Sequence, residues 1–151
     1  MLNRIFPRQF DNAYSGWRIA IWLFVPIVLV DLVIGANSMI STRMVAMSAD
    51  GIPLDRFGNG GAEAVIALFA LLGLSRLVIA LVCVVALIRY RSMVPLMYLT
   101  LLLLHLGNRA LNTLHPIATT AAPGALVVNV LLALLVTGFV LSLLPGKSRR
   151  A

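Results

Sequence analysis

Charged side chains are scarce in this sequence: they make up 11% of its 151 residues, while 61% of the residues are apolar. Soluble domains carry roughly a quarter charged residues, because their surfaces must be solvated. So few charges cannot cover the surface of a soluble domain, and the mean hydropathy of +1.01 agrees. The scarcity argues against an ordinary soluble protein and predicts an integral membrane protein.

Cysteine and histidine are also rare. The single cysteine, Cys83, excludes an internal disulfide and any relay of paired thiols within this chain. The two histidines, His105 and His115, would lie about 15 Å apart on one helix, so a single haem cannot use both. The sequence contains no HExxH motif, nucleophile elbow or phosphate-binding glycine loop. We therefore assign no catalytic, metal-binding or cofactor-binding residue, and we favour a non-enzymatic protein.

Acidic residues are few as well. The sequence has five acidic and twelve basic residues, which gives a formal net charge of +7. On a soluble protein this balance would suggest a nucleic-acid partner. Here the basic residues gather at the ends of apolar runs, where membrane topology requires them, so we expect no nucleic acid.

Four long apolar segments are what the sequence does contain. Each is long enough to cross about 30 Å of hydrocarbon as a helix rising about 1.5 Å per residue. Their ranges are about 17–38, 63–88, 93–114 and 125–144. They predict an all-α membrane protein with one four-helix transmembrane domain, 17–145, between a cytoplasmic or interfacial arm at 1–16 and a basic cytoplasmic tail at 146–151. For residues 1–16, an arm lying at the membrane interface and a floppy tail with a few aromatic residues are both open.

The connection at 39–62 lies between the first two segments and is rich in glycine and proline. Such turn formers predict an irregular, compact connection rather than a lid. Its methionines, Met39, Met44 and Met47, are interpreted as apolar filler in preference to copper(I) ligands.

The basic residues flank the segments mainly on one side. By the positive-inside rule that side is cytoplasmic, so both termini are expected in the cytoplasm and the bundle runs up-down-up-down. Eleven of the twelve basic residues are arginine, which suggests a bacterial genome and hence the bacterial cytoplasmic (inner) membrane. The residues on that side are Arg4, Arg8, Arg18, Arg89, Arg91, Lys147, Arg149 and Arg150.

Each segment carries one polar residue at a similar depth, about 20 Å from the cytoplasmic edge. These residues are Asp31, Arg76, His105 and Asn129. An arginine stays charged and is costly in hydrocarbon. We therefore expect Arg76 to face the bundle interior and pair with Asp31, while His105 and Asn129 add hydrogen bonds.

Small residues share the helix faces of three of these polar residues, which favours close helix contacts. They are Gly35 and Ser38 beside Asp31, Gly73, Ala80 and Cys83 beside Arg76, and Ala122, Ala125 and Ala133 beside Asn129. The third segment is more polar. Its residues Tyr98, Asn108, Arg109 and Asn112 fall on the side of His105 and are predicted to line an outer cleft.

In size and number of spans the chain resembles the small multidrug transporters. Those proteins use a glutamate in the first helix and have balanced flanking charge. This chain instead has Asp31 and a one-sided positive bias. No motif is shared, so we assign no family.

Three roles follow from the buried polar residues. Such residues can fix helix packing, or they can mark a pathway for ions, protons or substrates. Our first interpretation is a non-enzymatic subunit, accessory or binding protein of a membrane complex, whose partners are the lipid bilayer and another membrane protein or a second copy. The alternative is a small transporter or proton-coupled carrier. The third is a membrane enzyme acting on lipid or quinone.

Overall fold

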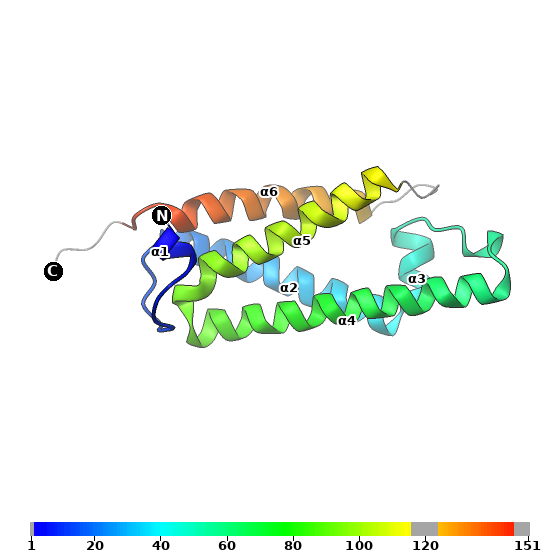
Figure 1. Ribbon diagram of the computed structural model, residues 1–151, viewed down its shortest axis with the longest axis horizontal. Coiled ribbons are helices and arrows are strands. Elements are labelled where there is room, and N and C mark those ends of the chain that lie inside the picture. The colour runs from blue at the N-terminus through cyan, green and yellow to red at the C-terminus, as the bar shows by residue number, and fades with distance from the viewer. Residues whose placement is uncertain (1, 116–123, 147–151) are drawn as a thin grey trace.

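The computed structural model describes residues 2–115 and 124–146, and every regular element within them is helical. Four helices in these ranges are long and apolar enough to cross a membrane (Figure 1). They are α2 (Arg18–Ile40), α4 (Asn59–Arg89), α5 (Val94–Leu114) and α6 (Gly124–Leu143). Their bounds lie within a few residues of the predicted segments. Ala122 and the basic tail beyond Gly146 lie outside the described residues.

The N-terminal arm packs across one end of the bundle, where α1 (Leu2–Ile5), the α4–α5 turn and the end of α6 meet (Figure 1). The turn contains the short 3₁₀ helix η3 (Arg91–Met93). The backbone N–H of Asp11 donates to Ser92 Oγ at 3.1 Å. Trp17 Nε1 donates to the carbonyl of Pro145 at 3.0 Å. These bonds tie the arm to both the turn and the end of α6.

The main core lies toward that same end. The ring centroids of Phe24 on α2 and Tyr98 on α5 are 4.6 Å apart, and both side chains are fully buried. The Tyr98 hydroxyl donates to the carbonyl of Ala20 at 2.7 Å. Leu131 and Leu135 bring α6 into the same core.

Helices α2 and α4 cross closely at two glycines. A Cβ added to Gly35 would lie 2.8 Å from the backbone nitrogen of Leu77, and one added to Gly73 would lie 2.8 Å from that of Met39. The absence of side chains therefore lets these two backbones meet. This contact positions Asp31 and Arg76, which lie one turn away from the two glycines.

The connection between α2 and α4 is more regular than the sequence predicts. It forms three short elements: α3 (Thr42–Met44), the π-helix η1 (Val45–Ala49) and the 3₁₀ helix η2 (Leu54–Arg56). They pack on the first turns of α4 through a small core in which Ala46, Ile52 and Leu54 are buried. We call residues 42–57 the cap. Glycine and proline indicate where a regular element ends, but they do not exclude short helices between those points. In this connection they separate short helical elements.

Large apolar side chains are exposed on the outer faces of the long helices. Examples are Trp22, Ile88 and Leu126. Soluble monomers rarely expose contiguous apolar surface on this scale. The four apolar helices and their exposed faces indicate a multi-pass membrane protein.

Candidate functional site

Arg76 on α4 and Asp31 on α2 form an ion pair inside the bundle. Arg76 Nε donates to Asp31 Oδ1 at 2.8 Å, and Arg76 Nη2 lies 2.6 Å from the same oxygen. The Asp31 side chain is 1% exposed, and that of Arg76 is 21% exposed. The close α2–α4 crossing brings these opposite charges together, so neither charge faces hydrocarbon without a partner.

His105 on α5 completes this contact as a neutral imidazole. Arg76 Nη2 lies 3.0 Å from His105 Nε2, and His105 Nδ1 lies 2.9 Å from the carbonyl of Leu101. A guanidinium can only donate and a carbonyl can only accept. Nε2 must therefore accept from Arg76 while Nδ1–H donates to Leu101, which assigns the tautomer from the hydrogen-bond network. We call Asp31, Arg76 and His105 the buried triad; with His105 neutral, its net charge is zero.

The second carboxylate oxygen of Asp31 is unusual. Arg76 uses Oδ1 twice, and within the described residues Oδ2 is buried without a hydrogen-bond partner. A bidentate arginine–carboxylate pair would use both oxygens. Oδ2 can therefore accept a further hydrogen bond or a proton, and among the described residues it is the one buried polar side-chain atom of the triad without a hydrogen-bond partner.

Asn129 is not part of the buried triad. It is exposed on α6, and its Oδ1 accepts a hydrogen bond of 2.5 Å from Arg109 Nη1 on α5. The small-residue face predicted beside it is also misplaced, since Ala125 and Ala133 are exposed. The buried face of α6 instead contains Leu131, Leu135, Gly138 and Ser142. Because α6 is apolar on all sides, its sequence does not indicate which side packs inward.

The predicted outer cleft divides into two parts. Tyr98 does not belong to it, because this side chain is buried in the core near the start of α5. Asn108, Arg109 and Asn112 are all exposed near the other end of that helix. Tyr98, His105 and Asn112 are spaced by seven residues and therefore share one face. That face is buried as far as His105 and exposed beyond it.

Asp50, at the end of η1 in the cap, is an acidic group near the triad that the sequence analysis did not place there. Burial of its carboxylate raises the pKa of Asp50, and the positive charge of Arg76 lowers it by a smaller amount. Part of the side chain is nonetheless exposed to solvent. The electrostatic interaction of Asp50 with Arg76 depends on how the cap folds. No residue spacing in the sequence predicts that fold.

The triad offers a carboxylate, a guanidinium and an imidazole, which supply charge, hydrogen bonds and groups that can bind a proton. Within residues 2–115 and 124–146, no three His, Cys, Asp or Glu side chains gather in a way that could hold a metal ion. The triad itself has no hydroxyl or thiol nucleophile. Comparison with protein-family models, curated proteins and solved structures finds no match to this chain.

Proposed function

We propose that this chain is a non-enzymatic subunit or accessory protein of a complex in the bacterial cytoplasmic membrane. In this proposal the four helices cross up-down-up-down and both termini are cytoplasmic. The contacts of the arm, the α4–α5 turn and the end of α6 support this topology, because they join the basic flanks at one end of the bundle. The positive-inside rule then assigns that end to the cytoplasm.

The observation that carries the subunit role is the change along α5. Its inner half buries Tyr98, Leu101 and His105, whereas every residue from Leu106 to Leu114 is exposed. The exposed half is also the polar half, with Asn108, Arg109 and Asn112. In the single chain these groups would face lipid or the bilayer interface.

A partner helix accounts for this pattern better than lipid does. Polar side chains in membrane helices are costly against hydrocarbon and stabilise contacts by hydrogen bonding to a neighbouring helix. The Arg109–Asn129 bond satisfies part of this need within the chain. The side chains of Asn108 and Asn112 form no hydrogen bond within the described residues, and a second polypeptide along this face would supply a partner. We call this face, residues 106–114, the outer α5 face.

Site-specific photocrosslinking in the native membrane tests the subunit role. A photoreactive amino acid replaces Asn108 on the outer α5 face. The matched control carries it at Val33, an exposed residue of α2 at nearly the same distance from the start of its helix. We expect a discrete adduct with one other polypeptide from position 108, and only lipid adducts from position 33.

Two outcomes would contradict the proposal. Equal protein adducts from both positions would mean that the outer α5 face is no special contact. An adduct with twice the mass of the chain would make it a homo-oligomer and not a subunit of a mixed complex. Correct folding of both variants is checked by their melting temperature in mild detergent, so that loss of an adduct is not caused by misfolding.

A proton-coupled carrier is the second candidate, and one observation favours it. Asp31 Oδ2 is buried without a partner among the described residues, and Arg76 beside it is partly exposed. Reconstituted liposomes with a pH gradient test this role. A carrier would dissipate the gradient faster than empty liposomes when a substrate is supplied, and Asp31→Asn would abolish the difference. No dissipation with the parent protein across candidate substrates would rule against it.

A further inference from the structure

A groove opens at the arm end of the bundle, between the arm, α2 and the α4–α5 turn. It has a volume of about 520 Å³. Arg18 at the start of α2 and Arg91 at the turn are the charged residues of its lining, and we call them the rim arginines. Its apolar wall runs away from the rim arginines along Trp22 and Val25 of α2 and Leu87 of α4. Val25 lies about two helical turns, or about 10 Å, beyond Arg18.

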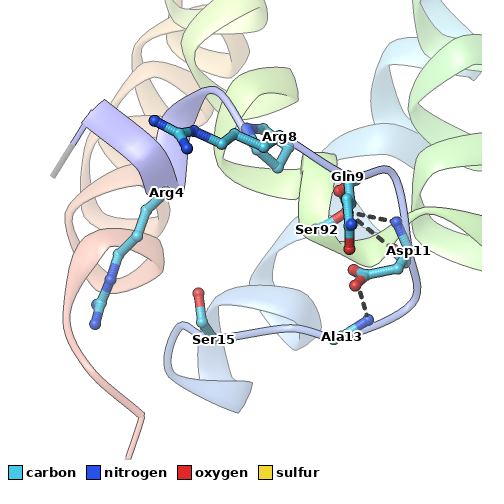
Figure 2. Close-up of a pocket in the computed structure, with 8 residues that line it drawn as sticks. Arg4, Arg8, Gln9, Asp11, Ala13, Ser15 and Ser92 are labelled. Carbon is cyan, nitrogen blue, oxygen red and sulfur yellow. Dashed lines mark hydrogen bonds between the residues drawn. The ribbon is translucent and has the colours of Figure 1, made fainter.

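The arm builds one side of this groove and is held in place. Asp11 and Ser92 are joined by three hydrogen bonds between arm and turn, two of which involve Ser92 Oγ (Figure 2). Tyr14 packs against the main core, and a Cβ on Gly16 would clash with the backbone of Ser142. Asn12 and Tyr14 line the groove. Asp11, Ala13 and Ser15 line the neighbouring pocket of Figure 2, so successive residues face opposite sides.

The charge of the groove is one-sided. Its described lining contains two arginines and no acidic residue. Arg91 Nε donates to the carbonyl of Leu87 at 3.2 Å, and in the described part of the chain neither Arg18 nor Arg91 forms an ion pair with a carboxylate. The neighbouring pocket differs, because the Asp11 carboxylate is part of its lining. The groove therefore suits an anion, and the pocket beside it does so less well.

We propose that this groove binds an anionic phospholipid of the adjoining leaflet, with its phosphate between Arg18 and Arg91 and an acyl chain along Trp22 and Val25. Both arginines stand at the ends of apolar helices, which is the level of the headgroups. Basic pockets between membrane helices bind acidic headgroups in this way. The inference requires only that the helices cross a membrane and does not depend on the subunit role.

The apolar wall selects a lipid over a soluble anion. Trp22 is 76% exposed, and together with Leu87 and Val25 it offers apolar surface that a free phosphate would leave uncovered. An acyl chain along this wall continues the hydrocarbon that surrounds the spans, so a lipid whose phosphate lies between Arg18 and Arg91 matches the polar and the apolar part of the lining. A phosphate attached to a hydrocarbon chain satisfies both halves of the groove at once.

Tryptophan fluorescence tests the proposal, because the chain has only two tryptophans. In the Trp17→Phe variant, Trp22 is the sole reporter. The protein is placed in nanodiscs that contain phosphatidylcholine and increasing fractions of phosphatidylglycerol with brominated acyl chains, which quench a nearby indole. We expect half-maximal quenching at a several-fold lower fraction than with brominated phosphatidylcholine.

Charge variants decide whether the rim arginines cause this preference. Arg18→Gln with Arg91→Gln should make the two lipids quench equally, and Arg18→Lys with Arg91→Lys should keep part of the preference. The matched control is Arg43→Gln with Arg56→Gln, which removes two exposed charges from the cap and should change nothing. Retained helicity by circular dichroism shows that each variant is folded.

Three results would overturn the inference. The first is equal quenching by both brominated lipids in the parent protein. The second is a preference for phosphatidylglycerol that survives the Arg18→Gln and Arg91→Gln changes. The third is full relief of quenching by millimolar inorganic phosphate, which would identify a site for a soluble anion.

Discussion

Arg76 is tolerated inside the bundle because its charge is compensated within hydrogen-bond distance. An arginine at the centre of a membrane helix costs about 3 kcal/mol on insertion scales. Here Asp31 neutralises it and His105 accepts a third N–H. The remaining cost falls on Asp31, whose Oδ2 is buried without a partner among the described residues. The triad thus links α2, α4 and α5 and leaves one carboxylate oxygen without a partner among the described residues.

A double-mutant cycle measures the Asp31–Arg76 interaction. Asp31→Asn leaves a buried cation and Arg76→Gln leaves a buried anion, so each single change should destabilise the fold strongly. The double variant leaves two neutral amides and should lose less than the sum, with a coupling of about 1–3 kcal/mol. Unfolding by sodium dodecyl sulfate in mixed micelles gives the free energies. Additive losses would show that the pair contributes no specific interaction.

Two tyrosines provide a matched comparison of buried hydroxyls. Tyr98→Phe removes a hydrogen bond to Ala20 and should cost about 1 kcal/mol of unfolding free energy. Tyr14→Phe removes a buried hydroxyl that has no partner among the described residues, so it should be neutral or slightly stabilising. The same unfolding assay compares them. An equal loss in both variants would mean that the Tyr14 hydroxyl has a partner in the membrane.

Among the helices, the α2–α4 crossing is the contact on which the triad depends. Gly35 and Gly73 let the backbones approach, and this proximity brings the opposite charges together. Neither helix has a marked amphipathic pattern, because each faces hydrocarbon over most of its circumference. Small residues and not apolar periodicity therefore determine which faces meet.

Gly73→Ala should separate α2 from α4. Its Cβ would meet the backbone of Met39 at 2.8 Å, and overpacking of this kind costs about 1–3 kcal/mol. Gly107→Ala on α5 is the control, since a Cβ there meets nothing within 4 Å. Alanine also favours helix, so the control should be neutral or stabilising. Thermal unfolding of both variants checks this, and an equal loss at the two positions would contradict the crossing.

The cap should respond to pH through Asp50. Burial raises the pKa of Asp50, so the folded state favours its neutral form and loses stability as pH rises through this pKa. Asp50→Asn removes that loss. The variant should therefore gain stability relative to the parent between about pH 4, the ordinary range of an aspartate, and neutral pH. Melting temperatures at pH 3 and pH 7 measure this; a pH-independent difference would contradict it.

Counting residues from the helix ends predicts the depth of each polar residue in the bundle, but not the side of the helix that packs inward. Distances from the helix ends put Asp31, Arg76 and His105 at one level, and their close contact in the structure agrees with that count. The same count included Asn129, which is exposed in the structure. Because α6 is apolar on all sides, its sequence does not show which side packs inward. Tyr98 and Asn112 share a helix face, yet only one is buried, since burial depends on which neighbour is present. The electrostatic interaction between Asp50 and Arg76 could not be predicted from the sequence, because it depends on how the cap folds.

Taken together, the bundle has two unequal ends. The arm end is closed by hydrogen bonds between distant segments and contains the main core. At the other end, the cap covers the first turns of α4, while the outer α5 face is polar and exposed. We interpret the closed end as the lipid-anchored one and the exposed face as the contact for a partner.

Native mass spectrometry of the protein, extracted gently from its own membrane at natural expression level, tests the subunit role most directly. We predict a stoichiometric mass excess from a second polypeptide. That excess should be lost when Asn108 and Asn112 are replaced by leucine and kept when Arg43 and Arg56 are replaced by glutamine. A bare monomer, or a complex made only of copies of this chain, would contradict the proposed role.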